Sequence, residues 1–272
     1  MRKEFSSIVK NLISSDSSFA LLLGDISVGL FLNENEELPK NIYNLGVLEQ
    51  SMISFAAGLS RGGVTPFVHT ISAFLIERAY EQIKLDLRYN NNKIIMVSAN
   101  GPFDYNKLGP THHSSSDVPL IELLGSINIY LPGRVEDVKQ CINLAIKSTN
   151  SSYIRLNSQK NLLSEIEPGI IYKKKNNSKS LLVFVGESLN NNQTSIPNIK
   201  EDWIYIFDIE SLDINKIKEY QEIIFWEPYS KPLAAYKYKK FLSNKVKLTS
   251  YIYPESIQNG IFKSPNYLKI KV

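Results

Sequence analysis

The sequence predicts an α/β protein in which a domain built on a parallel sheet is followed by a smaller α/β domain. Short apolar runs, typical of buried strands, alternate with longer segments whose apolar residues recur at helical spacing. A polar segment at 173–180 separates this alternation from a second, shorter one. Strands joined by helical crossovers pair in parallel and are covered on both faces. We expect domains at 1–170 and 178–272.

The elements of the first domain follow from the apolar runs and the residues that end them. Residues 19–23 form a short strand that ends at Gly24-Asp25, and Gly62-Gly63 ends a helix over 47–60. In order, the pattern predicts strands at 19–23, 64–68, 94–97, 127–131 and 152–156, and helices at 47–60, 71–88, 118–124 and 134–148. The stretch 99–117 reads as a long irregular loop, and such loops in compact domains are usually functional.

The second domain shows the same alternation in a shorter form. The pattern predicts strands at 181–185, 203–207, 223–226 and 246–251, and helices at 212–219 and 230–242. This half contains no histidine, and its buried-looking runs are aliphatic and aromatic. We therefore expect a structural or dimerisation module rather than a second centre of chemistry.

Composition excludes several classes of protein. The chain has 272 residues, of which 43% are hydrophobic and 21% charged, so it is neither disordered nor a small disulfide scaffold. Its one cysteine, Cys141, excludes an internal disulfide and fits a reducing compartment. The net charge is only +4 and the lysines are scattered, which argues against a nucleic-acid partner. No apolar stretch is long enough to span a membrane and no signal peptide is recognisable, so we expect a cytoplasmic protein.

The sequence contains few candidates for catalytic or metal-binding residues. The three histidines are His69, His112 and His113, and the adjacent pair diverges too much to chelate one ion, so we expect no metal site in this chain. Phosphate-binding, dinucleotide-binding and serine-nucleophile motifs are absent from the sequence. Ligands of open α/β sheets bind beyond the carboxyl ends of the strands, where Gly24-Asp25, His69 and the loop 99–117 are expected.

Glu49 stands in the first turn of a helix whose sequence is largely apolar. Such a carboxylate is partly desolvated, which suits it to share a proton with a bound group. Taken alone, the position is more typical of a partner of the helix dipole or of a solvent-facing residue. The neighbouring motifs decide between these interpretations.

Several motifs occur in a fixed order along the first domain. They are Gly24-Asp25, the segment 44–50 leading into Ala56-Ala57-Gly58-Leu59, Pro66-Phe67, Phe74 with Arg78-Ala79-Tyr80-Glu81-Gln82, and Gly109-Pro110-Thr111-His112. Together they resemble the pyrimidine-binding domain of the transketolase family of thiamine-diphosphate enzymes. The motifs cover roughly residues 15–160, and the rest is similar to the family's C-terminal domain in its order of elements.

The resemblance implies how this chain would bind thiamine diphosphate. Glu49 matches the glutamate that hydrogen-bonds a ring nitrogen of the aminopyrimidine, and this proton relay activates the cofactor. Phe74 matches the aromatic residue that stacks on the pyrimidine, although Phe74 alone would suggest core packing. Ile71 stands where the first of the family's helix aromatics is usual. Asp25 matches an acidic residue near the cofactor, at the boundary between two chains, or else caps a helix.

The resemblance also implies a substrate channel. His112 matches a histidine that hydrogen-bonds the substrate and takes part in proton transfer. His113 and His69 are weaker candidates for the channel wall. Asn100 aligns with another channel histidine of the family.

Two departures from the family pattern concern substrate recognition. Leu108 replaces an aspartate that contacts a donor hydroxyl, and a leucine cannot recognise a hydroxyl. A phosphate-binding arginine aligns approximately with Ser158, with Arg155 nearby. We therefore expect a substrate other than an ordinary pentose phosphate, such as an unusual or nucleotide-linked sugar, or a simpler two-carbon donor.

The family binds the diphosphate and its metal through a Gly-Asp-Gly…Asn motif, whereas here Ile26 follows Gly24-Asp25. The resemblance thus implies the small subunit of a split transketolase. A diphosphate-binding partner subunit would anchor the cofactor with Mg²⁺ or Ca²⁺, in a 2+2 heterotetramer. The alternatives are a β-type subunit of an enzyme that decarboxylates 2-oxoacids, a deoxyxylulose-phosphate-synthase-like subunit, and an inactive assembly or regulatory paralogue. The presence of Glu49 and Phe74 argues against the last.

Overall fold

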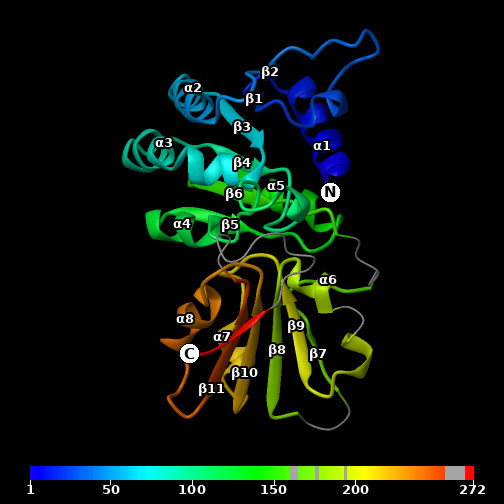
Figure 1. Cartoon of the computed structure of the whole chain (residues 1–272), viewed down its shortest axis with the longest axis vertical. Coiled ribbons are helices and arrows are strands. Elements are labelled where there is room, and N and C mark those ends of the chain that lie inside the picture. Colours follow the sequence, from blue (N-terminus) through cyan, green and yellow to red (C-terminus); the bar gives the residue numbers. More distant parts are fainter. Residues whose placement is uncertain (160–164, 175–177, 193–194, 255–266) are drawn as a thin grey trace.

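Two six-stranded sheets, one in each half of the chain, form the framework of the computed structural model (Figure 1). The structure describes residues 1–159, 165–174, 178–192, 195–254 and 267–272. The first sheet is parallel throughout, in the order β2-β1-β3-β4-β6-β5. Its strands are β1 (Phe19–Leu23), β2 (Ile42–Asn44), β3 (Thr65–Thr70), β4 (Ile95–Ser98), β5 (Ile127–Tyr130) and β6 (Ser151–Arg155).

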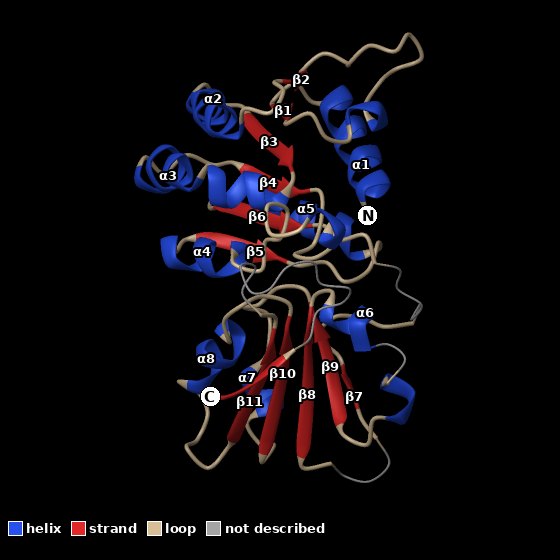
Figure 2. Cartoon of the chain, in the orientation of Figure 1, coloured by secondary structure: helices blue, strands red, loops and turns tan. Residues whose placement is uncertain are grey.

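Helices cover both faces of this sheet, with α2, α3 and α4 on one face and α1 and α5 on the other (Figure 2). The α-helices are α1 (Arg2–Ser15), α2 (Glu49–Arg61), α3 (Tyr80–Gln82), α4 (Asp117–Leu124) and α5 (Asp137–Lys147). π-Helical segments at Ala73–Arg78 and Ile83–Tyr89 flank α3, and 3₁₀ turns lie at Val28–Leu30 and Asn106–Leu108.

Alternation along the strands divides the core between the two faces. Leu22 and Val68 point to the layer that contains α2, whereas Leu21 and Phe67 point to the layer that contains α1. Because both faces are covered, β1 is buried along its whole length. This explains why the strands are continuous apolar runs in the sequence.

The second sheet has the order β12-β11-β10-β8-β9-β7, in which the four inner strands are parallel and the edge strands β7 and β12 are antiparallel. Its strands are β7 (Ile171–Tyr172), β8 (Ser180–Val185), β9 (Asp202–Ile206), β10 (Glu222–Glu227), β11 (Lys247–Ile252) and β12 (Leu268–Lys271). The helices are α6 (Ser188–Asn192), α7 (Ile214–Ile217) and α8 (Leu233–Lys239), with a 3₁₀ turn at Ile196–Asn198.

The α/β prediction is confirmed, and every predicted strand is present within two residues of its expected ends. The sequence analysis missed α1, β2, β7, α6 and β12, and the predicted helix 71–88 is interrupted by π-helical turns. Because β7 pairs with β9, the second sheet begins at Ile171, before the expected start of the second domain at 178. The division into domains at 1–170 and 178–272 stays a prediction.

The carboxyl ends of the inner strands of the second sheet face the first half of the chain. The backbone N–H of Leu131, after β5, donates to the carbonyl of Phe207, after β9 (2.7 Å). The N–H of Gly133 donates to the hydroxyl of Tyr205 (2.6 Å). These bonds join the two halves of the chain just beyond the carboxyl end of β5.

Candidate cofactor and substrate site

Glu49 is the first residue of α2 and its side chain is fully buried. The hydroxyl of Thr70, at the end of β3, donates to Oε1 (3.0 Å). The guanidinium of Arg78 donates to Oε2 (2.7 Å) and completes an ion pair. The carboxylate is therefore held from two sides by elements that meet at the carboxyl edge of the first sheet.

The close approach of β1 to β3 places Thr70 within reach of Glu49. The N–H of Gly24, after β1, donates to the carbonyl of His69 (3.0 Å). A Cβ atom at Gly24 would lie 2.7 Å from both Cβ and Oγ1 of Thr70, and 3.2 Å from Sδ of Met52. Glycine is therefore required there for steric reasons, since any side chain would push Thr70 away from Glu49.

Phe74 is half-buried on the first π-helical segment, between a cation and an imidazole. The guanidinium carbon of Arg78 lies 4.1 Å from the centre of the Phe74 ring. The ring of His112 meets Phe74 edge-on, at 5.1 Å between centroids and an interplanar angle of 66°. The structure thus brings the predicted residues Glu49, Phe74 and His112 into one row through Arg78. π-Helical turns are frequent at functional sites.

His112 is half-buried at the end of the predicted Gly-Pro-Thr-His motif. Its Nδ1 lies 2.9 Å from the hydroxyl of Thr111, and the ring of Tyr105 lies 6.1 Å away. Leu108 is 58% exposed on the same loop, so its apolar side chain faces outward. Ile71 is half-buried, and its carbonyl accepts a bond from the N–H of Leu75 (2.8 Å).

Three predicted substrate residues are buried in structural contacts. Asn100 accepts a bond from the N–H of Ser72 (3.1 Å) and donates to the carbonyl of Gly101 (2.8 Å), which joins the loop to the π-helical segment. His113 packs on the ring of Phe103, with 5.0 Å between centroids. Neither side chain lies at the surface, and their roles toward a substrate stay predictions.

His69, the third of these residues, is fully buried on the side of the sheet that faces α1. Its Nδ1 lies 2.9 Å from the carbonyl of Val97 and its Nε2 lies 3.1 Å from the hydroxyl of Ser27. Burial lowers the pKa of His69 to about 4, so the ring is neutral at physiological pH. Both ring nitrogens have partners within the chain, and a substrate contact by His69 also stays a prediction.

Asp25 is exposed after β1, in a left-handed backbone conformation with φ of 58°. The side-chain amide of Asn44 donates to the Asp25 carboxylate (3.1 Å) and accepts a bond from the Asp25 backbone N–H (3.1 Å). These bonds fix the turn at the same edge of the sheet as Glu49.

A buried cluster of charges joins the two halves and was missed by the sequence analysis. The guanidinium of Arg155 is fully buried, pairs with Asp117 (2.8 Å) and donates to the carbonyl of Pro228 (2.8 Å). Glu187, after β8, lies 3.8 Å from Arg155. Burial raises the pKa of Glu187 to about 8, against the effect of this cation. An arginine at the end of a buried strand was the available signal, because such a charge requires partners.

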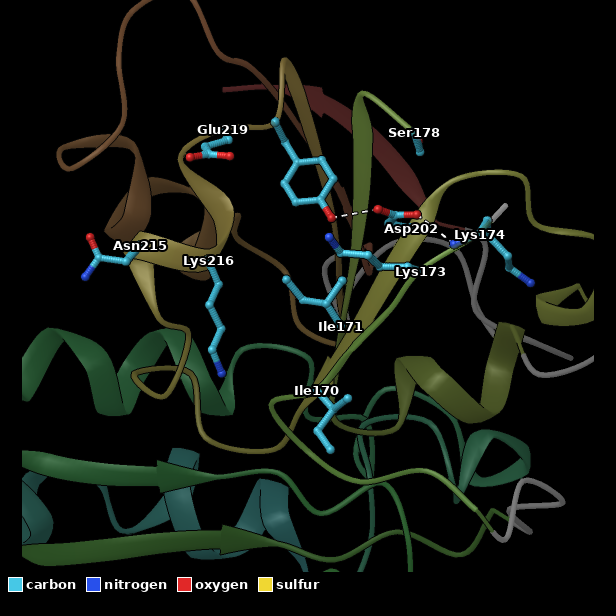
Figure 3. Close-up of a pocket in the computed structure, with 10 residues that line it drawn as sticks. Ile170, Ile171, Lys173, Lys174, Ser178, Asp202, Asn215, Lys216 and Glu219 are labelled. Atoms are coloured by element: carbon cyan, nitrogen blue, oxygen red, sulfur yellow. Dashed lines mark hydrogen bonds between the residues drawn. The ribbon is translucent and has the colours of Figure 1, made fainter. Parts of the chain in front are cut away.

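A groove in the second half of the chain lies apart from these side chains (Figure 3). It has a volume of about 670 Å³ and is lined by residues on and next to β7, β9 and α7, among them three lysines, Lys173, Lys174 and Lys216. Its buried acid, Asp202, accepts bonds from the hydroxyl of Tyr220 (2.7 Å) and the N–H of Lys174 (2.9 Å). None of the predicted site residues lines this groove.

Among the described residues, none of the helices has the length and apolarity needed to cross a bilayer. In the same ranges, no group of three or more His, Cys, Asp or Glu side chains is arranged to hold a metal ion.

Known proteins share part of the sequence or the fold of this chain. The chain is 32% identical over 194 residues to a subunit of the apulose-4-phosphate transketolase of Actinobacillus succinogenes, a match that covers 70% of this chain and 61% of that protein. It is 28% identical to the 1-deoxy-D-xylulose-5-phosphate synthase of Syntrophus aciditrophicus over 44% of this chain and 18% of that one. The chain thus spans less than two thirds of the length of these relatives.

A solved structure described as "Split gene transketolase, inactive beta4 tetramer" has the same fold, with a TM-score of 0.76 over 95% of this chain and 89% of that one, at 18% identity. The family model "Transketolase, pyrimidine binding domain" matches residues 1–162, which contain the whole first sheet and the row from Glu49 to His112. The chain therefore belongs to the transketolase pyrimidine-binding domain family.

Proposed function

We propose that this chain is the pyrimidine-binding subunit of a thiamine-diphosphate-dependent enzyme that transfers a two-carbon ketol unit between sugars. The observation that carries the proposal is the row formed by Glu49, Arg78, Phe74 and His112 at the carboxyl edge of the first sheet. It combines a buried carboxylate, an aromatic face and a loop histidine, which are the groups that the resemblance implies. The name of the relative from Actinobacillus succinogenes supports the same activity.

The residues present fit the pyrimidine end of the cofactor. A neutral heterocycle needs a buried acid at its ring nitrogen and an aromatic face to stack on, and Glu49 and Phe74 lie close enough to be joined by one arginine. Thiamine diphosphate, when bound, supplies the carbon nucleophile that takes up the ketol unit. Glu49 would hold a proton at the ring nitrogen, and Thr70 would keep its carboxyl oriented.

Residues around this row would complete the site. His112 would hydrogen-bond the sugar, since it contacts Phe74 and its side chain is only half-buried. Ile71 would add apolar contact near Phe74, and Asp25 would face the boundary between the two chains. His69, His113 and Asn100 would act mainly by supporting the loop and the strand ends, in keeping with their burial.

A partner chain would bind the diphosphate together with Mg²⁺ or Ca²⁺, in a 2+2 heterotetramer. Apolar side chains are exposed on β2, in the turn just before Glu49 and on α2, namely Tyr43 (44%), Val47 (58%), Leu48 (57%) and Phe55 (50%). Exposed apolar side chains of this kind are typical of a surface covered by a partner. The relative from Actinobacillus succinogenes is itself named as one subunit of its enzyme, which supports this view.

The substrate is proposed to differ from an ordinary pentose phosphate. Leu108 is exposed on the loop that carries His112, and its side chain cannot hydrogen-bond a donor hydroxyl. The relative acts, by its name, on apulose 4-phosphate, which is consistent with an unusual sugar.

The test is a ketol-transfer assay on the chain co-purified with a diphosphate-binding partner, using a panel of sugar donors. Glu49→Gln should abolish turnover and leave assembly intact, whereas the matched change Glu81→Gln, outside the row, should alter neither. Efficient use of xylulose 5-phosphate would contradict the substrate proposal. Release of carbon dioxide from pyruvate without ketol transfer would instead favour the synthase-like alternative, to which the similarity with deoxyxylulose-phosphate synthase lends support.

A further inference from the structure

Arg78 takes both positions that a pyrimidine ring would need in the proposed site. Its guanidinium donates to Oε2 of Glu49 at 2.7 Å and lies 4.1 Å above the centre of the Phe74 ring. Its side chain is 39% exposed, whereas that of Glu49 has no exposed surface. The arginine thus lies between the carboxylate and solvent.

The chemistry of the two planar groups explains why one can replace the other. A guanidinium is flat, donates N–H bonds to a carboxylate and stacks on aromatic faces. A protonated or amino-substituted pyrimidine makes the same two kinds of contact, with the same partners in the proposed site. Arg78 therefore occupies the ring's place in the chain as it stands.

The remaining contacts of the site would survive the departure of Arg78. Thr70 holds the other carboxylate oxygen, Oε1, at 3.0 Å. His112 contacts Phe74 edge-on and does not depend on the arginine for this contact. Arginine has a long, flexible side chain that already reaches solvent, so it can swing outward without rearrangement of the backbone.

We propose that Arg78 is a displaceable cover on the pyrimidine position, so that cofactor entry competes with the Glu49–Arg78 ion pair. The inference rests on the proposed thiamine-diphosphate function. Arg78 would thus keep Glu49 covered until the cofactor arrives.

The strength of the contacts that Arg78 makes with Glu49 and Phe74 sets the expected change in cofactor affinity. Partly exposed ion pairs and cation–π contacts each change an equilibrium by less than about fivefold. Removing both with Arg78→Gln should therefore tighten thiamine diphosphate binding to the assembled complex by about three- to tenfold, measured by calorimetry. Arg78→Lys, which keeps the charge but not the planar stacking, should give an intermediate affinity. Arg61→Gln, which removes an arginine that bonds Asn90 (3.0 Å) on the surface, should leave the affinity unchanged.

A positive result has a signature that a merely structural role would not give. Arg78→Gln should lower the concentration of cofactor needed for half-maximal activity without raising kcat, whereas a structural arginine would weaken binding when removed. Unchanged or weaker binding by Arg78→Gln would overturn the inference. In a double-mutant cycle, the effects of Glu49→Gln and Arg78→Gln on the free energy of unfolding should not be additive when measured by thermal unfolding of the isolated chain. Additive effects would also overturn the inference.

These outcomes separate the inference from the proposed function. The proposed function stands, and the proposal that Arg78 is a displaceable cover is wrong, if three results are found together. These are that the wild-type complex binds thiamine diphosphate, that Glu49→Gln loses turnover, and that Arg78→Gln binds the cofactor no more tightly than wild type. If the wild-type complex does not bind thiamine diphosphate, both are wrong.

Discussion

Replacement of Gly24 by alanine should change the orientation of the Glu49 carboxylate indirectly, by moving Thr70. The added Cβ would lie 2.7 Å from Cβ and Oγ1 of Thr70, whereas carbon atoms ordinarily approach to about 3.5–4.0 Å. Sδ of Met52, at 3.2 Å, belongs to a flexible side chain, but Cβ of Thr70 is fixed to strand β3. The strand ends must therefore separate by about 1 Å, and overpacking of this kind costs about 1–3 kcal/mol.

The displacement should also reach the proposed site. A shift of Thr70 by this amount breaks its 3.0 Å hydrogen bond to Glu49. Because hydrogen bonds to charged groups contribute about 1.5–3 kcal/mol, the carboxyl loses much of its fixed orientation. We expect cofactor affinity of the assembled complex to fall by about tenfold or more.

Thermal unfolding of the isolated chain and calorimetry of the complex would measure the two effects. For a chain of this size, Gly24→Ala should lower Tm by about 2–12 °C. The control is Gly58→Ala in α2, where an added Cβ would meet no heavy atom within 4 Å among the described residues. That change should raise the free energy of unfolding by about 0.5–1 kcal/mol. Equal Tm values for Gly24→Ala and wild type, or an unchanged cofactor affinity, would refute the reasoning.

Four other expectations can be checked with single variants. Burial raises the pKa of Glu187 to about 8 from an ordinary 4.5. Between these two values the folded chain keeps a proton that the unfolded chain has lost. The free energy of unfolding should therefore fall as the pH rises from 4.5 to about 8. Urea unfolding at several pH values should show a flatter profile for Glu187→Gln, and identical profiles would contradict this. Asp117→Asn leaves Arg155 buried without its 2.8 Å partner and should cost about 3–5 kcal/mol by urea unfolding, whereas Glu222→Gln, at a partly exposed pair, should cost less than about 1 kcal/mol. Phe74→Ala should weaken cofactor binding by about three- to tenfold in calorimetry, with Phe74→Leu in between, and equal affinities would exclude stacking. His112→Ala should raise KM for the sugar more than it changes cofactor affinity, and the opposite pattern would place His112 on the cofactor.

Strands were easier to predict than short or polar-rich elements. Both faces of the first sheet are covered, so its buried strands appear as apolar runs in the sequence. In α1 the buried residues Phe5, Val9 and Ile13 recur at helical spacing, but lysines and serines separate them and no side chain caps the helix. β2 and β7 have only three and two residues, too few for a periodic signal.

Site residues that belong to a sequence motif could be predicted. Contacts between side chains that are far apart in the sequence could not. The spacing of Glu49 and Arg78 does not reveal that they pair, because they lie on different elements. His69 could have been placed from the pattern, since in a strand it shares a face with Phe67, whose side chain points toward α1. Arg155 finds partners on α4 and beyond β10, and no local pattern records contacts between the two halves of the chain.

The loop that carries His112 is tied to the second half of the chain. The hydroxyl of Ser115 donates to the carbonyl of Pro254 (2.8 Å), and the backbone carbonyl of Ser115 accepts a bond from the N–H of Ser230 (2.8 Å). The second half therefore supports the loop that carries the proposed substrate residue His112, although it holds none of the proposed reacting groups. Chimeras that exchange this half between relatives should alter which sugars are accepted, and grafts intended to preserve specificity must transfer residues 99–116 together with the surface that anchors them.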